Sequence, residues 1–277
     1  MSALAAVRPY TALFTSRFQQ MLQYRGAAVA GFATQCWWGG LKVMILTAFY
    51  STGSGNAPIT LAQAITYAWV SQALLAMLPW FADPDVATAV RTGAVSYDRL
   101  RPVDFYSLWF ARAAGWIAAR VVPRAALMLG FSAIVLPLVG LRAWSWQLPA
   151  TFSAGALFAV SLALALLLAA AMVMLLNIAT AALLNARGIN AIAAAPTILL
   201  SGNLLPLSLF PDWAQTCLLL QPFAGLLDIP ARIYFGALEG ASALGGLGVQ
   251  ALWFTAIVVF GRWWLARVLR SLEMQGG

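Results

Sequence analysis

ATFSAGALFAVSLALALLLAAAMVMLLNIATAALL, residues 150–184, contains no charged side chain. Folded as a helix, it would extend about 52 Å at about 1.5 Å per residue, well beyond the roughly 30 Å hydrocarbon core of a bilayer. Such a run predicts a membrane-spanning helix that tilts or projects out of the membrane. It therefore decides the fold class, which is an all-α membrane protein.

The composition of the whole chain agrees with this class. The sequence is 62% hydrophobic and 9% charged, whereas a soluble domain carries about 25% charged residues. The sixteen basic residues are dispersed among apolar runs, which favours control of membrane topology over nucleic-acid binding. Membrane lipids are therefore the expected surroundings, and no nucleic-acid partner is predicted.

Apolar runs predict six transmembrane helices in a single domain that covers 1–277. Their ranges are 27–50, 61–82, 121–141, 150–184, 189–206 and 246–264. Residues 1–25 mix Leu and Phe with Arg and Gln, which predicts an amphipathic helix on the membrane surface. Residues 105–120 contain Arg112 and Arg120 and are expected to lie partly in the interface.

Two segments differ from this pattern. Residues 83–106 are the longest polar stretch and follow the second predicted span. Residues 207–236 are apolar, but Pro211, Pro222 and Pro230 cut them into pieces too short to cross a bilayer. Such pieces enter a membrane face when protein or water satisfies their backbone groups, so we predict re-entrant helices on the outer side.

The arginines give the orientation. With the N-terminus inside, the outer side receives only Arg142 and Arg232. The inner side receives Arg8, Arg17, Arg25, Arg91, Arg99, Arg101, Arg187, Arg262, Arg267 and Arg270. The positive-inside rule therefore predicts that both termini are cytoplasmic.

The sequence offers no catalytic machinery. Histidine is absent, and the two cysteines, Cys36 and Cys217, are predicted to be buried free thiols. The only lysine, Lys42, lies in an apolar run, so a G-x-x-x-x-G-K-[ST] phosphate loop is missing. The acidic residues lie at or outside the predicted span ends, which disfavours an ion-coupled transporter or a membrane-embedded enzyme. We predict no catalytic residue, metal site or bound cofactor in this chain.

Two local motifs resemble one family. The first comprises Gly93, Leu100-Arg101-Pro102-Val103 and Tyr106. The second comprises Leu205-Pro206, Phe210-Pro211, Trp213, Gln221-Pro222-Phe223, Pro230 and Gly236. Together with the surface helix and six spans, they resemble the type-2 ABC exporter permeases over essentially the whole chain.

The resemblance implies a set of partners and a location. Two permease subunits, identical or related, would enclose a path at their interface in the bacterial inner membrane. Two ATP-binding subunits would dock at the cytoplasmic face and would bind ATP and Mg there.

The resemblance further implies that 83–106 contains a short helix that couples the permease to the ATPase. Asp85 to Arg91 fit this helix, with Pro84 suited to its first turn and Gly93 to its end. The alternative is a solvated loop whose charges only set topology. The candidate coupling residues are Asp85, Thr88, Arg91, Gly93, Arg99, Arg101 and Pro102.

Polar residues within the spans are candidates for the substrate pathway. Lys42 either faces a cavity or extends its charge to the outer surface. A stripe on the fifth span either lines the path or joins helices by hydrogen bonds. Trp213 is a gate candidate or an interfacial anchor. The full set is Lys42, Asn190, Thr197, Ser201, Asn203 and Trp213.

The expected function is therefore that of a permease subunit of an ATP-driven exporter. Apolar spans with few charges favour hydrophobic or amphipathic cargo, such as drugs, natural products or lipid-like molecules. A secondary transporter and a glycan exporter are the alternatives.

Overall fold

Helix α8 (Phe152–Leu183) lies at the centre of the molecule, where α4, α6, α9, α11 and α12 all contact it. Ala169, Ala170 and Ala171 in α8 are completely buried. Small side chains let neighbouring helices approach closely, and membrane proteins use them at such contacts. The charge-free run at 150–184 therefore forms the helix around which the others pack.

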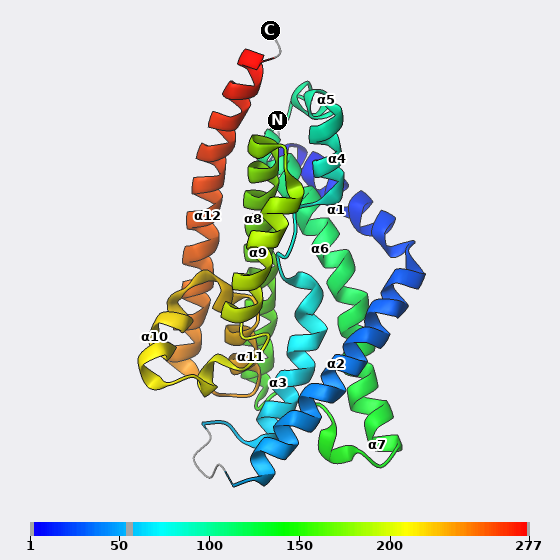
Figure 1. Cartoon of the computed structure of the whole chain (residues 1–277), viewed down its shortest axis with the longest axis vertical. Coiled ribbons are helices and arrows are strands. Elements are labelled where there is room, and N and C mark those ends of the chain that lie inside the picture. The colour runs from blue at the N-terminus through cyan, green and yellow to red at the C-terminus, as the bar shows by residue number, and fades with distance from the viewer. Residues whose placement is uncertain (1–2, 54–57, 276–277) are drawn as a thin grey trace.

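The computed structural model describes residues 3–53 and 58–275, which are helical with short connections and no strand in these ranges (Figure 1). The elements before α8 are α1 (Ala3–Leu22), α2 (Arg25–Ser51), α3 (Leu61–Leu74), η1 (Leu75–Met77), α4 (Pro84–Thr92), α5 (Val95–Arg99), α6 (Phe105–Gly130), the π-helical turn η2 (Phe131–Val135), α7 (Leu136–Leu138) and η3 (Arg142–Trp144). Those after it are α9 (Ala186–Leu200), η4 (Leu207–Leu209), α10 (Asp212–Leu220), η5 (Pro222–Gly225), α11 (Asp228–Tyr234) and α12 (Gly240–Gln275).

The molecule is elongated and has two distinct ends (Figure 1). Both chain termini, α4 and α5 lie at one end, which we call the α4 end. The last turns of α2 and the short helix α7 lie at the opposite end, which we call the α7 end. Helix α1 packs along α6 near the α4 end.

Three helical stretches are long and apolar enough to cross a membrane, judged on the described residues. They are Phe105–Leu138, Phe152–Leu183 and Gly240–Arg270, and Ala186–Leu200 is a shorter apolar helix. The multi-pass membrane character predicted from composition therefore has a structural counterpart in these stretches.

Helix bounds differ from the predicted ranges in several places. Helix α6 begins at Phe105 and runs without a break through the residues expected to lie in the interface before a span at 121–141. The Arg120 guanidinium carbon lies 5.0 Å from the Phe81 ring centroid and 4.5 Å from the Trp116 ring centroid. Aromatic rings can hold a cation inside a bundle, so the arginine does not interrupt the helix.

Helices α3 and α9 are shorter than their predicted ranges, 61–82 and 189–206. Regular helix in the first range ends at Met77, and α9 ends at Leu200. Gly202 follows α9 with a φ of 81°, and a Cβ at this position would lie 2.2 Å from the Tyr67 hydroxyl. Because Tyr67 approaches the backbone so closely, position 202 requires glycine. Its positive φ is not helical, so the helix does not continue through it.

The segment 207–236 consists of four short helices, η4, α10, η5 and α11, interrupted near its prolines. It lies beside α12 (Figure 1). Cys217 in α10 is exposed and Cys36 in α2 is half-buried, so the prediction that both cysteines are buried is wrong. For Cys217 the reason is that α10 lies at the surface and has no buried residue. Both cysteines are free thiols.

Candidate functional site

The short helix α4 is the centre of the polar segment 83–106. Asp83 is its N-cap, and the Asp83 carboxylate accepts a hydrogen bond from the Asp85 N–H at 2.9 Å. Pro84 occupies the first turn, and Gly93 ends the helix with a φ of 75°. The helix expected at Asp85 to Arg91 is thus present, and its two ends use the residues that the sequence suggested.

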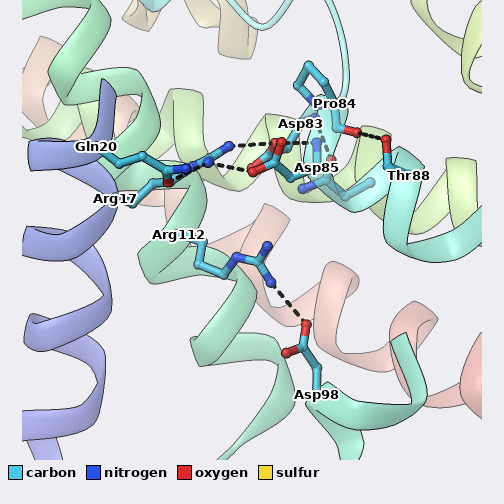
Figure 2. Close-up of polar contacts among 9 residues, drawn as sticks. Arg17, Gln20, Asp83, Pro84, Asp85, Thr88, Asp98 and Arg112 are labelled. Carbon is cyan, nitrogen blue, oxygen red and sulfur yellow. Dashed lines mark hydrogen bonds and ion pairs between the residues drawn. The ribbon is translucent and has the colours of Figure 1, made fainter. Parts of the chain in front are cut away.

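Arg17 of α1 binds the start of α4 (Figure 2). Its Nη2 lies 3.2 Å from Asp83 Oδ1, and its Nη1 lies 2.5 Å from Asp85 Oδ2. The Gln20 side chain accepts a further hydrogen bond from Arg17 Nη1 at 2.9 Å. The Arg17 side chain is 9% exposed and that of Asp83 is 0% exposed, so this is a buried charge pair. We call it the Arg17 clamp.

The peptide that enters α4 is also tied to two other helices. Asp83 N–H donates to Asn177 Oδ1 of α8 at 2.8 Å. Ala82 N–H donates to Asn190 Oδ1 of α9 at 2.9 Å. We call Ala82 and Asp83 the α4 hinge, because this pair joins α4 to α1, α8 and α9.

Burial raises the pKa of the Asp83 carboxyl from its ordinary value, whereas the Arg17 charge and the Asp85 N–H act in the opposite direction. Arg17 therefore favours the charged form of a carboxyl group that burial disfavours.

A second set of ion pairs fixes the segment that follows α4. Arg112 Nη1 lies 2.9 Å from Asp98 Oδ2, and this contact anchors α5 to α6 (Figure 2). Arg101 Nε lies 3.7 Å from Asp98 Oδ1. At the start of α6, Asp104 pairs with Arg262 of α12 at 3.0 Å. The segment 83–106 is therefore attached to the bundle at both ends.

An apolar cavity of about 530 Å³ lies between α8, α9 and α12. Met172 of α8, Thr197 of α9 and Phe260 of α12 line it, and Phe223 and Trp253 lie at its wall. The Thr197 hydroxyl donates to the Ala193 carbonyl at 2.7 Å, so its proton is already bonded within α9. The lining therefore suits hydrocarbon or aromatic groups rather than ions.

A buried polar network lies where α9 ends. The Tyr67 hydroxyl donates to the Gly202 carbonyl at 2.9 Å and to Asp228 Oδ1 at 3.1 Å. Asp228 Oδ1 also accepts from the Leu207 N–H at 2.9 Å, and Asp228 Oδ2 lies 3.8 Å from Arg232 Nη1. Asp228 and Tyr67 are 0% and 2% exposed. We call this the α9-end network.

Lys42 extends the α9-end network to α2. Its Nζ donates to both the carbonyl oxygen and, at 3.3 Å, the side-chain oxygen of Asn203. The structure thus brings together two residues that were predicted separately as pathway candidates. The Lys42 charge is directed to the end of α9 and lies among protein groups.

The remaining predicted residues have different surroundings. On the coupling side, Thr88 donates to the Pro84 carbonyl, and Arg91 and Pro102 are exposed. Arg99 belongs to α5, and its side chain lies outside the described part of the structure. On the pathway side, Ser201 accepts from the Asn203 N–H, and Trp213 is 83% exposed.

The predicted stripe of the fifth span therefore divides into three environments. Asn190 supports the α4 hinge, Thr197 lines the cavity, and Ser201 lies beside the α9-end network. Arg17, Asn177, Tyr67 and Asp228 were not predicted as site residues. Only their polarity in apolar or amphipathic surroundings would have suggested them. Among the described residues, no three His, Cys, Asp or Glu side chains are grouped as a metal site would require.

Asn177→Ala is expected to destabilise the protein by about 1–3 kcal/mol, because it leaves the buried Asp83 N–H without its acceptor. Thermal unfolding in detergent measures the effect. Thr180→Ala is the matched control on the same helix, since the buried Thr180 hydroxyl has no hydrogen-bond partner. Equal stabilities of the two variants would contradict the role given to Asn177.

Comparison with known proteins gives one match. A family model described as "ABC-2 family transporter protein" matches residues 37–276. A search of the curated proteins finds no match.

Proposed function

This chain belongs to the ABC-2 family of transporter proteins, and we propose that it is the permease subunit of an ATP-driven exporter. The observation that carries the proposal is the attachment of α4. This short helix is joined to α1 by the Arg17 clamp and to α8 and α9 by Asn177 and Asn190. Such a helix transmits a push from a docked ATPase to several membrane helices at once.

The proposed topology has six crossings, made by α2, α3, α6 with α7, α8, α9 and α12. The α4 end is then cytoplasmic, and the segment from η4 to α11 enters the outer leaflet without crossing. Arginines support this orientation, since Arg91 belongs to α4, Arg187 lines a hollow with it and Arg262 pairs with Asp104, whereas Arg142 lies between α7 and α8. The proposed location is a bacterial inner membrane with both termini inside.

ATP and Mg would bind to separate ATP-binding subunits beneath the α4 end, and this chain would hydrolyse nothing itself. A second permease, identical or related, would complete the path. ATP-driven closure of the partner subunits would displace α4, and the α4 hinge would pass that displacement to α8 and α9.

The cargo proposed for this path is hydrophobic or amphipathic. The apolar cavity supports this class, because its walls are aromatic and aliphatic and its one hydroxyl, on Thr197, is already bonded. A drug, natural product or lipid-like molecule fits such a lining better than an ion.

The experiment that tests the proposal is co-purification followed by transport. The tagged chain should retain an ATP-binding subunit, and transport of a fluorescent hydrophobic probe from vesicles should require ATP. Transport that ignores ATP and follows a proton gradient, with no ATPase bound, would instead indicate a secondary transporter.

Ala193→Trp is expected to place an indole ring in the cavity and to reduce transport about tenfold, because the ring takes space that the cargo would occupy. Probe transport by reconstituted complexes measures this, with ATPase activity as the check on assembly. Ala195→Trp is the matched control, since Ala195 is exposed on the same helix and does not line the cavity. Undiminished transport by Ala193→Trp would exclude the cavity from the path.

A further inference from the structure

Two arginines of α6 have no role in the proposed function. Arg120 and Arg124 are four positions apart, so they lie one turn from each other on the same face of the helix. Both side chains are half-buried. Like charges at this spacing repel each other, so an anion beside them would stabilise the arrangement. We call these two residues the α6 arginine pair.

Arg120 has no carboxylate partner among the residues that the structure describes. Its guanidinium lies over the Phe81 and Trp116 rings, and no hydrogen bond or ion pair joins it to another residue of the described ranges. Asp83 acts on its charge from beyond ion-pair distance, but Asp83 is bound by Arg17. Aromatic faces attract the cation without accepting the N–H donors at the edge of the guanidinium. These donors are therefore available to a further group.

Arg124 lies against the start of α2. Its Nη2 donates to the Ala27 carbonyl at 3.3 Å. A Cβ at Gly31 would lie only 2.7 Å from Arg124 Nε, so glycine at this position leaves the space in which the guanidinium lies. One neutral carbonyl does not compensate the charge. The α6 arginine pair therefore places two positive charges beside the contact between α2 and α6.

The depth of the pair follows from its contact with α2. Ala27 comes two residues after the start of α2, and α2 packs along α6 (Figure 1). In the proposed topology α2 enters the membrane from the cytoplasmic side, so Arg124 lies near the inner face. Leu127 follows Arg124 by three positions on the same face of α6 and is 44% exposed. Because α6 runs outward, this apolar side chain lies deeper in the membrane than the two charges.

We propose that the α6 arginine pair binds the phosphate of an anionic phospholipid from the inner leaflet, at the contact between α2 and α6. A phosphate accepts several charge-assisted hydrogen bonds from guanidinium groups. Basic pockets between membrane helices on the cytoplasmic side suit such headgroups. A lipid is favoured over a soluble phosphate because Leu127 offers an acyl chain an apolar surface below the charges. The inference uses the proposed orientation of the chain and requires no ATP-binding subunit.

Arg124→Gln is the principal variant. Glutamine can still donate to the Ala27 carbonyl while the charge is lost, so the packing of α2 on α6 should survive. Arg120→Gln removes the other charge and is combined with it in a double variant. Arg267→Gln on α12 is the matched control, because Arg267 is exposed and its guanidinium also lies over a ring, at 4.3 Å from the Trp263 centroid. It loses the same charge without touching the α6 arginine pair.

The measurement uses the purified chain alone, in neutral detergent. Phosphatidylglycerol is titrated in, the rise in unfolding temperature gives its apparent affinity, and native mass spectrometry counts the lipids retained. We expect the parent chain to prefer phosphatidylglycerol to phosphatidylcholine. Arg124→Gln should bind phosphatidylglycerol about fivefold more weakly and the double variant at least about tenfold more weakly, with Arg267→Gln unchanged. Glycerol 3-phosphate, a soluble phosphate, should not stabilise the parent chain at the same concentration.

Parental affinity in Arg124→Gln and in the double variant would overturn the inference. An equal loss in Arg267→Gln would also overturn it, because it would indicate a general attraction of basic residues to anionic lipid. Glycerol 3-phosphate that stabilises the parent as well as phosphatidylglycerol does would assign the pair to a soluble phosphate instead of a lipid. None of these results bears on the proposed function, since no ATP-binding subunit takes part in the measurement.

Discussion

Replacing Arg17 with alanine is expected to abolish ATP-driven transport while the chain still inserts into the membrane. The substitution removes the only cation that pairs with Asp83 and Asp85 among the described residues. Removing one partner of a buried ion pair costs about 3–5 kcal/mol, because the other charge stays buried and uncompensated. The lost contact lies at the α4 hinge, so α4 should separate from α1 before the rest of the helices unfold.

The measurements are ATP hydrolysis and probe transport by the reconstituted complex, and the expected variant hydrolyses ATP without moving the probe. Arg17→Lys keeps the charge but cannot bind both aspartates as a guanidinium does, so an intermediate loss is expected. Arg8→Ala is the matched control, because Arg8 is exposed on the same helix. Full coupling in Arg17→Ala would show that α1 takes no part in transmission.

Local sequence signals predicted the elements that depend on local physics. The charge-free run gives α8, and Pro84 and Gly93 mark the two ends of α4. These signals work because a helix cap or an apolar run acts within a few residues. The extent of α6 was not predictable in this way, because Arg120 lies over Phe81 of a distant segment as well as over Trp116 of its own helix.

In the candidate site, too, the sequence predicted individual residues but not the contacts that the tertiary fold creates. Sequence reasoning selected Lys42 and Asn203 as polar residues in apolar surroundings, but their pairing across 161 positions comes from the tertiary fold. Arg17 belongs to the range predicted as an amphipathic helix on the membrane surface, where arginine normally faces the headgroups. Only the contact between α1 and the α4 hinge reveals that its charge faces inward to Asp83.

Asp228→Ala is expected to produce the largest loss of stability in the half of the molecule away from α4. Asp228 is fully buried, accepts hydrogen bonds from the Tyr67 hydroxyl and the Leu207 N–H, and lies 3.8 Å from the Arg232 guanidinium. Its removal leaves an uncompensated arginine and an unsatisfied Leu207 N–H, a loss of about 3–5 kcal/mol, whereas the Tyr67 hydroxyl keeps the Gly202 carbonyl. Thermal unfolding in detergent should show this loss, and Ser201 to Asn203, which follow α9, should lose protection from hydrogen exchange.

Two comparisons separate the α9-end network from a general effect of charge removal. Asp212→Ala removes an exposed carboxylate from α10 in the same segment and should leave unfolding nearly unchanged. Tyr67→Phe removes one hydroxyl and keeps the ring, so its cost should be about 1–2 kcal/mol and localised at Gly202. If Asp228→Ala and Asp212→Ala unfold at the same temperature, Asp228 does not hold the end of α9. The position of α9 would then depend on Lys42 and on the packing of α9 against α8. In that case the cavity between α8 and α12 could change its width without breaking the α9-end network.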